Sequence, residues 1–189
     1  MYKRQEILGV GDQYGPSRSL VFSPDGRYIA TADGARQVNI FKVTKKGELF
    51  RDSSLAGHSG GISDLRWAPD GRSFYTVGED GLLIKWSTHD IDGWYPEWHQ
   101  AWSVGLVSLE ISLDGRSLYV GTRDGRVEMA DAKTGEAIEN LLAIESGVAF
   151  GLILSEDGKR LVYGSGGGDG AKGWDLSLIH ISEPTRPLH

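Results

Sequence analysis

The chain of 189 residues contains no cysteine, which excludes disulfide bonds and metal sites built on thiolate ligands. Its apolar runs are short, and none approaches the roughly 20 residues of a membrane-spanning helix. Basic residues are outnumbered, with 20 Lys and Arg against 26 Asp and Glu and a net charge of −6. Proteins that bind nucleic acid generally present a basic surface. We therefore expect neither nucleic acid nor a membrane as a partner, and the compartment stays open, with the cytoplasm as the default.

Glycine, by contrast, is abundant, with 27 residues, many of them in turns between short β-like runs. An Asp-Gly pair followed by Arg or Lys occurs four times, at Asp25-Gly26, Asp70-Gly71, Asp114-Gly115 and Asp157-Gly158. Successive pairs are 45, 44 and 43 residues apart. A nearly constant spacing of this size indicates one supersecondary unit that has been copied, and copied units must stack to bury their apolar faces.

The second copy of this unit is the clearest. Residues 62–67 alternate apolar and polar side chains, as a strand with one buried face does. Two tight turns follow, at Asp70-Gly71 and at Asp80-Gly81, where glycine tolerates the positive φ that such turns need. The strands of this copy are predicted at 62–67, 73–77, 82–86 and about 94–104.

Gly57-His58, Asp80-Gly81 and Trp86 carry a family resemblance. The second copy resembles a WD repeat, in which a Gly-His pair is followed about two dozen residues later by an Asp-Gly turn and then by a strand that ends in Trp-Asp. Ser87 stands where Asp is usual, and the other copies are degenerate. The resemblance to the WD-repeat family covers nearly all of residues 6–175.

This resemblance implies an all-β fold, a partial β-propeller of about four blades, each a four-stranded antiparallel sheet. The blades are expected near residues 15–56, 57–104, 105–143 and 147–175. Outside the second copy, strands are predicted at 18–23, 28–31, 37–43, 48–55, 107–112, 117–121, 126–130, 136–143, 148–154, 160–163 and 171–174. The fourth strand of the last blade is missing or is replaced by Glu6–Val10. Because rings in this family have about seven or eight blades, a piece of four is expected to expose two apolar faces and to be prone to aggregation or dimerisation.

Both ends of the chain resemble a translated sequencing adapter. Tyr2-Lys3-Arg4-Gln5 can be encoded by TATAAGAGACAG, and the reverse complement of that DNA encodes Leu-Ser-Leu-Ile, the sequence of residues 176–179. We therefore expect residues 1–5 and 176–189 to be adapter-derived tails outside the fold, and residues 6–175 to be a propeller fragment of a larger protein.

His58, Thr76, Asp80 and Trp86 stand where the WD-repeat family places a hydrogen-bonded tetrad. The resemblance implies that Asp80 accepts from the His58 ring, that the ring reaches Thr76, and that Thr76 reaches the Trp86 indole. A His-Asp-Thr set also suggests catalysis. A tetrad that stiffens a blade lines no cavity, however, so we expect a structural role for these four residues.

Two further clusters suggest a site only weakly. His89, Asp90 and Asp92 could supply metal ligands, but their spacing matches no known ligand pattern. Residues 164–170 are as rich in glycine as a phosphate-binding loop but lack its Gly-Lys-Ser/Thr ending, which favours a looser version of the turn at 78–81. No nucleophile elbow and no pair of carboxylates in a plausible cleft is evident. We therefore predict no catalytic residue, no metal and no cofactor.

The upper rim of a WD-repeat propeller commonly contacts partners. It is built from the turns between second and third strands and from the loops that enter the first strands. The resemblance therefore makes Arg36, Ser59, Glu79 and Arg123 candidate partner-binding residues.

Trp94 and Trp98 are partner-binding candidates for a different reason. With Trp102 they fall on alternating positions, which places all three on one face of a strand. They either pack the outer strand of the second blade against its neighbour or form an aromatic surface patch of the kind that anchors partners.

Two functions are consistent with these features. The first is a non-catalytic scaffold for protein–protein interaction, because rigid blades hold many variable loops on one face. The second is an accessory domain of a larger enzyme, such as a peptidase, a kinase or a cytochrome-type protein. The scaffold is the preferred hypothesis, with protein partners whose identity the sequence does not give.

Overall fold

The computed structural model describes residues 17–33, 36–89, 93–143, 147–165 and 171–175. Within these ranges it contains fifteen β-strands and no helix, and accordingly no helix that is long and apolar enough to cross a membrane. The strands are β1 (Ser17–Phe22), β2 (Tyr28–Asp33), β3 (Gln37–Val43), β4 (Leu49–Ala56), β5 (Ile62–Trp67), β6 (Ser73–Gly78), β7 (Leu82–His89), β8 (Gly93–Ala101), β9 (Leu106–Ile111), β10 (Ser117–Thr122), β11 (Arg126–Asp131), β12 (Ala137–Ala143), β13 (Ala149–Leu154), β14 (Arg160–Ser165) and β15 (Ala171–Asp175).

The strands form four antiparallel sheets in which strands adjacent in sequence pair with one another. The first sheet holds β1–β4, the second β5–β8, the third β9–β12 and the fourth β13–β15. This arrangement confirms the predicted all-β partial propeller. In the fourth sheet three strands are described, and Glu6–Val10, the candidate for its fourth strand, lies outside the described residues, as do both predicted adapter tails.

The largest differences from the predicted strand ends are in the second sheet. There β7 continues to His89 and β8 ends at Ala101, whereas the sequence predicted ends at 86 and 104. The two strands pair from Leu82↔Ala101 to His89↔Gly93, so most of the connection expected between them is strand.

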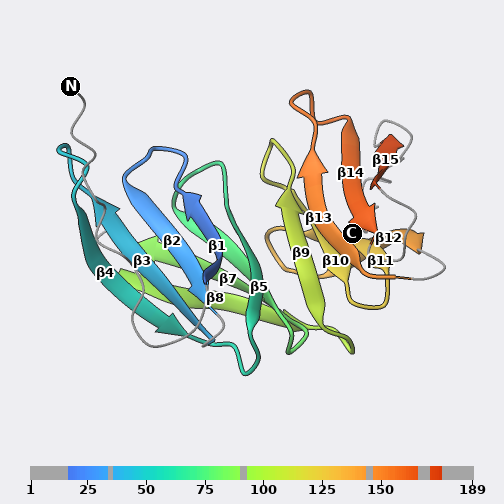
Figure 1. The fold of residues 1–189 in the computed structure, drawn as a ribbon, viewed down its shortest axis with the longest axis horizontal. Coiled ribbons are helices and arrows are strands. Elements are labelled where there is room, and N and C mark those ends of the chain that lie inside the picture. The colour runs from blue at the N-terminus through green and yellow to red at the C-terminus, as the bar shows by residue number, and fades with distance from the viewer. Residues whose placement is uncertain (1–16, 34–35, 90–92, 144–146, 166–170, 176–189) are drawn as a thin grey trace, which may run out of the picture.

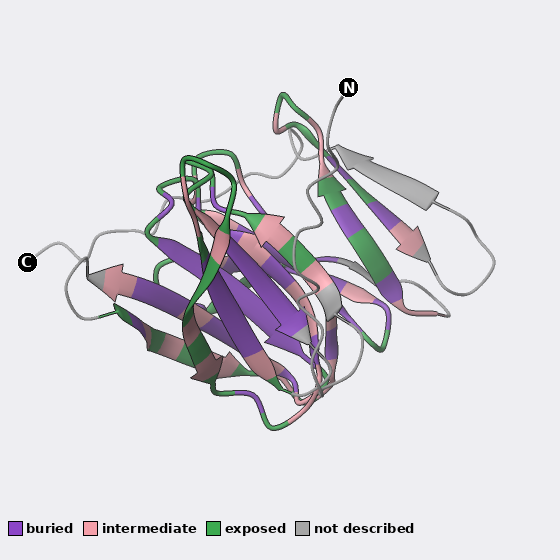
Figure 2. Cartoon of the chain, turned by 60° about the vertical axis from the view of Figure 1, so that its left-hand side comes forward, coloured by how far each residue is buried: buried purple, intermediate pink, exposed green. Residues whose placement is uncertain are grey.

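The sheets are stacked in chain order, and their first strands β1, β5, β9 and β13 contact one another in turn (Figure 1). Three apolar clusters fill the spaces between successive sheets. Since each middle sheet is covered on both faces, β6 is buried along its whole length, and Figure 2 shows buried residues running through the middle of the stack with exposed residues at the turns.

Polar contacts cross each of these interfaces near the first strands. Between the first and second sheets, the Trp67 indole nitrogen donates to the Val21 carbonyl at 3.1 Å. Between the second and third, the Leu109 amide donates to Asp64 at 3.0 Å. Between the third and fourth, the Ser108 hydroxyl donates to the Ala149 carbonyl at 2.7 Å. Because buried polar groups need partners, these bonds favour one register between neighbouring sheets.

The repeated Asp-Gly pairs form the turn between the first two strands of each sheet. Each Asp carboxylate accepts the amide of the residue two positions later, at 2.8–3.1 Å, and each Gly has a φ of 66–71°. Such φ values suit glycine. In three of the four turns a serine hydroxyl two residues before the Asp also donates to the carboxylate, whereas Ala68 stands at that position in the second sheet.

Candidate partner-binding face and its supporting tetrad

Four side chains of the second sheet form a continuous hydrogen-bonded chain from its outer part to its upper turn. The Trp86 indole nitrogen donates to the Thr76 hydroxyl at 2.9 Å, and that hydroxyl lies 2.8 Å from His58 Nε2. His58 Nδ1 lies 3.0 Å from Asp80 Oδ1. The structure therefore brings together all four residues of the predicted tetrad, and Thr76 and Trp86 are 0% and 1% exposed.

The protonation of His58 follows from its surroundings. Burial lowers the pKa of His58, an effect that the hydrogen bond and charge of Asp80 oppose. The ring is then neutral near pH 7, with Nδ1–H donating to Asp80 and Nε2 accepting from the Thr76 hydroxyl. Burial also acts to raise the pKa of Asp80, but the bonds from His58 and the Leu82 amide outweigh it and lower the value.

The Asp80 carboxylate extends this chain into the loop above it. Its Oδ2 accepts the amides of Ser59 at 2.7 Å and Gly60 at 3.2 Å, so the tetrad fixes the loop that enters β5. Gly78 makes room for this contact, because a Cβ there would lie 2.6 Å from both Asp80 Oδ1 and His58 Nδ1. The His58 and Asp80 side chains are 0% and 6% exposed, and Trp86 packs in the apolar cluster between the first and second sheets.

Three predicted rim residues lie close together above the second and third sheets. Ser59 follows the tetrad histidine, and Glu79 and Arg123 are exposed at equivalent places in the turns β6–β7 and β10–β11. Arg123 Nη2 lies 4.0 Å from Glu79 Oε1, and the Arg123 amide donates to the Gly105 carbonyl at 2.8 Å. The rim here is a small, mixed-charge surface on a fixed backbone.

Arg36, the fourth predicted rim residue, lies apart from these three in the turn that enters β3. It is exposed and has a φ of 72°, and it is the one non-glycine residue with positive φ among the described residues. One and two repeats later the same position is Gly81 and Gly125, with φ of 77° and 86°. A left-handed conformation costs a non-glycine residue about 1–2 kcal/mol.

Trp94 and Trp98 do not share a face, and that prediction is wrong. The register of β7 and β8 passes from Trp86↔Pro96 to Lys85↔Trp98, so Glu97 is an extra, bulged residue. A β-bulge reverses the alternation of side chains beyond it. Trp94 consequently packs toward the first sheet and is 9% exposed, whereas Trp98 and Trp102 pack toward the third sheet.

The aromatic surface patch is accordingly not present around Trp94, whose ring lies 5.4 Å from that of Trp67. Trp98 is half-buried, with its ring 5.9 Å from that of Tyr75. Its indole nitrogen is buried and has no hydrogen-bond partner among the described residues. Both side chains belong to interfaces between sheets.

The third sheet contains a polar link that the sequence analysis missed. Glu128 is 7% exposed, and its carboxylate accepts from the Trp102 indole nitrogen at 2.7 Å and from Arg126 Nη1 at 2.6 Å. Trp102 stands 44 residues after His58, one repeat later. The corresponding position in the third copy thus carries an indole donor in place of an imidazole, and the Gly-His signature gave no signal for it.

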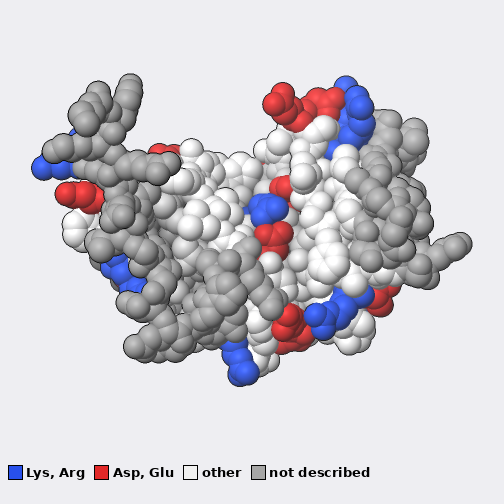
Figure 3. Space-filling model, in the orientation of Figure 1, with Lys and Arg blue, Asp and Glu red and all other residues white. Residues whose placement is uncertain are grey.

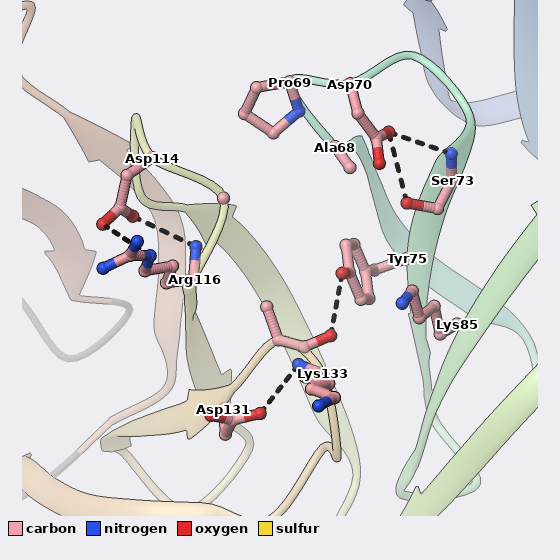
Figure 4. Close-up of a pocket in the computed structure, with 12 residues that line it drawn as sticks. Ala68, Pro69, Asp70, Ser73, Tyr75, Lys85, Asp114, Arg116, Asp131 and Lys133 are labelled. Carbon is pink, nitrogen blue, oxygen red and sulfur yellow. Dashed lines mark hydrogen bonds and ion pairs between the residues drawn. The ribbon is translucent and has the colours of Figure 1, made fainter.

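A pocket of about 360 Å³ opens between the second and third sheets at the end opposite the rim. Three turns surround it and contribute Asp70, Asp114 and Asp131, while Lys85, Arg116 and Lys133 supply equal positive charge (Figure 4). At its base the Tyr75 hydroxyl donates to the Ala132 carbonyl at 2.9 Å. Burial, with the charges of Asp70, Glu97 and Asp131, raises the pKa of Tyr75, so its phenol stays protonated.

The weaker candidates receive no support from the described residues. No group of three or more His, Asp or Glu side chains there could hold a metal ion. Asp90 and Asp92, two of the three suggested ligands, lie outside the described residues, as does most of the glycine-rich segment 164–170.

A family model described as WD domain, G-beta repeat, matches residues 11–42 and 51–87, and the second segment contains the whole tetrad. A WD repeat-containing protein 26 homolog from Arabidopsis thaliana is 24% identical over 144 residues, which is 76% of this chain and 24% of that protein. The chain belongs to the WD-repeat family. WD repeats generally mediate protein–protein interaction, and WD-repeat proteins are generally non-catalytic scaffolds.

Two further relatives match this WD-repeat chain, one over a shorter stretch and one over a longer stretch. Protein HIR1 from Yarrowia lipolytica is 42% identical over 98 residues, or 44% of this chain and 9% of that protein. The pre-mRNA-splicing factor cwf17 from Schizosaccharomyces pombe is 26% identical over 163 residues, or 85% of this chain and 46% of that protein. The chain thus spans less than half the length of each of these relatives.

Proposed function

We propose that this chain is a non-catalytic scaffold that binds protein partners on its upper rim, through Arg36, Ser59, Glu79 and Arg123. Membership of the WD-repeat family supports interaction with proteins as the general role. The net charge of −6 favours protein over nucleic acid as the partner. We choose the rim for two reasons. Arg36 has a left-handed backbone conformation, and the loop at Ser59 is held by a hydrogen bond to Asp80.

The backbone conformation of Arg36 is the main observation that supports the rim as the binding surface. A non-glycine residue in a left-handed turn lowers stability, while the same position one repeat later is glycine. Strained residues of this kind concentrate at functional sites, where the side chain contributes something that glycine cannot. At an exposed turn, an arginine offers a charged, five-donor group for a carboxylate or a backbone carbonyl of a partner.

The tetrad has a supporting role in this proposal. Thr76 is fully buried between His58 and Trp86, so its hydroxyl cannot meet a substrate. Asp80 holds the amides of Ser59 and Gly60. We infer that the tetrad stiffens the second sheet and presents the rim loop in one conformation, which lowers the entropy lost when a partner binds.

The experiment is a selection of binding peptides from a displayed random library on the immobilised chain, followed by affinity measurements on variants. Binding of the selected peptides is expected to weaken at least tenfold in Arg36→Gly and in Arg123→Glu. Asp70→Asn and Lys133→Ala, in the pocket at the opposite end, are the matched controls and should leave affinity within twofold.

The reverse pattern, with peptides lost from Asp70→Asn or Lys133→Ala and retained by both rim variants, would place binding in the pocket and overturn the rim. Short single-stranded RNA and duplex DNA serve as the alternative ligands. Binding of either nucleic acid at physiological salt, with no peptide selected, would contradict the scaffold itself.

A further inference from the structure

A lysine lies on a sheet face where the neighbouring sheets have buried apolar residues. On the molecular face seen in Figure 3, charged side chains of the described residues gather at the edges and in one central cluster. Lys85 instead pairs with Tyr75 on the face of the second sheet that packs against the third, and its side chain is 14% exposed. One repeat earlier and one repeat later the same position is Ile40 and Met129, which are 0% and 1% exposed. A charged side chain cannot replace the core packing of those residues.

Ser73 leaves open a space that an aromatic side chain fills at the neighbouring interface. Between the first and second sheets, the ring of Tyr28 stacks on that of Trp67 with centroids 6.4 Å apart and meets Trp94 edge-on at 5.8 Å. One repeat later the position of Tyr28 is Ser73, which lines the pocket between the second and third sheets. The volume of this pocket, about 360 Å³, falls within the range of small-ligand pockets, about 300–1,000 Å³.

The Lys85 ammonium can bind a further acceptor. Among the described residues its one partner is Glu97, whose two carboxylate oxygens both lie 3.2 Å from Nζ. An ammonium carries three N–H donors, and a mostly buried charge is stabilised by additional hydrogen bonds. Figure 4 shows Lys85 beside Tyr75 on one wall of the pocket, across from the turn that holds Asp114 and Arg116. Lys85 is therefore placed to donate to a carboxylate that enters the pocket.

Asp70 and Asp131, on two of the surrounding turns, each keep one carboxylate oxygen for a ligand. In each residue Oδ1 accepts two backbone amides of its own turn, at 2.8 and 3.2 Å for Asp70 and at 2.8 and 2.9 Å for Asp131. No described residue donates to the Oδ2 atom of either. Asp114 differs, because Arg116 Nε lies 3.9 Å from its Oδ2. The charges held in place for a ligand are thus one cation, Lys85, and two carboxylates.

From this arrangement we propose that the pocket binds a small zwitterion of the amino-carboxylate class, with its carboxylate on Lys85 and its ammonium on Asp70 and Asp131. A ligand with both charges is favoured because a simple anion would be repelled by the two carboxylates and a simple cation by the lysine. Pro69 and the ring of Tyr75 also line the pocket and suit an alkyl chain between the two charged ends. The site lies at the end opposite the rim, so it is independent of the proposed partner-binding residues.

The test is a titration of the full chain with 6-aminohexanoate, followed by the amide NMR signals, alongside hexylamine and hexanoate, which each keep one of its two charges. The zwitterion is expected to bind at least tenfold more tightly than either and to shift signals at 69–73 and 131–134. Lys85→Met, which introduces the residue of the third sheet, should weaken its binding at least tenfold, and Asp70→Asn at least threefold. The matched controls are Lys42→Met, at an exposed position of β3, and Asp25→Asn, in the equivalent turn of the first sheet. Both should change the affinity by less than twofold.

Several results would overturn the zwitterion site. Hexylamine that binds as tightly as 6-aminohexanoate would indicate a plain cation site, and hexanoate that does so a plain anion site. The absence of shifts at millimolar zwitterion, or binding that a folded Lys85→Met variant retains unchanged, would contradict the proposal as well. Should Lys85→Met not fold, Lys85→Gln, which keeps a polar side chain, carries the same expectation. Arg36→Gly should leave 6-aminohexanoate binding unchanged, so failure of the pocket and failure of the rim are distinguishable.

Discussion

The indole nitrogen of Trp86 donates a 2.9 Å hydrogen bond to the hydroxyl oxygen of Thr76, and neither side chain is more than 1% exposed. This bond joins the middle of β7 to the middle of β6, inside one sheet. Through His58 it continues to Asp80 and to the rim loop. The stability of the sheet and the shape of the rim are therefore coupled.

Thr76→Val removes the centre of this chain without changing side-chain volume much. It leaves the Trp86 N–H and His58 Nε2 buried without a partner, and an orphaned buried group costs about 1–3 kcal/mol. The free energy of unfolding, measured by denaturant titration, is expected to fall by at least about 1 kcal/mol. The control Thr134→Val, at an exposed turn position, should change it by less than about 0.5 kcal/mol.

Asp80→Ala tests whether the tetrad is structural or catalytic. It removes the acceptor of the His58 ring and of two loop amides, so the melting temperature should fall while peptides selected on the wild type still bind to the folded variant. An activity that disappears from this variant at unchanged melting temperature would contradict the structural role.

The buried histidine predicts a pH dependence near neutrality. Burial lowers the pKa of His58 below its ordinary 6.5, so the unfolded chain binds the proton more readily than the folded one. The stabilisation is fully present above about pH 6.5 and declines as the pH falls toward the lower folded value. Denaturant midpoints from pH 7.5 to 5 should show this slope, His58→Gln should abolish it, and the exposed His99→Gln should keep it.

A second pH effect belongs to the Asp-Gly turns. The hydroxyl of Ser23 and the amide of Arg27 lower the pKa of Asp25 to about 2. Hydrogen bonds from Ser112 and Ser155 also lower the pKa values of Asp114 and Asp157. Since these carboxylates are stabilised in their charged form, their contribution holds above about pH 4 and is lost as the pH falls through the folded values. Carboxyl NMR titration of Ser23→Ala should show the Asp25 pKa rising toward 3.8, with that of Asp157 unchanged.

Relief of the left-handed strain at Arg36 is expected to stabilise the chain. Arg36→Gly should raise the free energy of unfolding by about 1 kcal/mol, because glycine adopts a φ of 72° without the Cβ clash. The reciprocal change, Gly81→Ala, places a Cβ 2.5 Å from the Trp102 carbonyl at a φ of 77° and should destabilise by more than this. No gain in stability for Arg36→Gly would contradict the strain, and with it the argument for the rim.

Much of the fold follows from local features of the sequence. The four Asp-Gly pairs mark the turns between first and second strands, and alternation of side chains marks the strands beside them. The spacing of His58, Thr76, Asp80 and Trp86 corresponds to residues that lie within hydrogen-bond distance in the structure. These relationships lie within one repeat, so a short window of sequence contains them.

The relationships that escaped prediction depend on register or on two sheets at once. The bulge at Glu97, which separates Trp94 from Trp98, has no marker in the alternating pattern of tryptophans, because that pattern assumes regular pairing. The carboxylate of Glu97 instead binds Lys85 and Ser87 of the neighbouring strand. The pocket beside Tyr75 likewise needs turns from two sheets, which only their packing brings together.

The measurement that tests the scaffold most directly is hydrogen–deuterium exchange of the chain with and without a selected peptide at saturating concentration. The account predicts slower exchange at residues 36–37, 57–61, 79–81 and 122–126 of the rim, with no change at 69–72, 113–116 and 132–135 around the pocket. Protection confined to the pocket turns, with the rim exchanging as in the free chain, would contradict it.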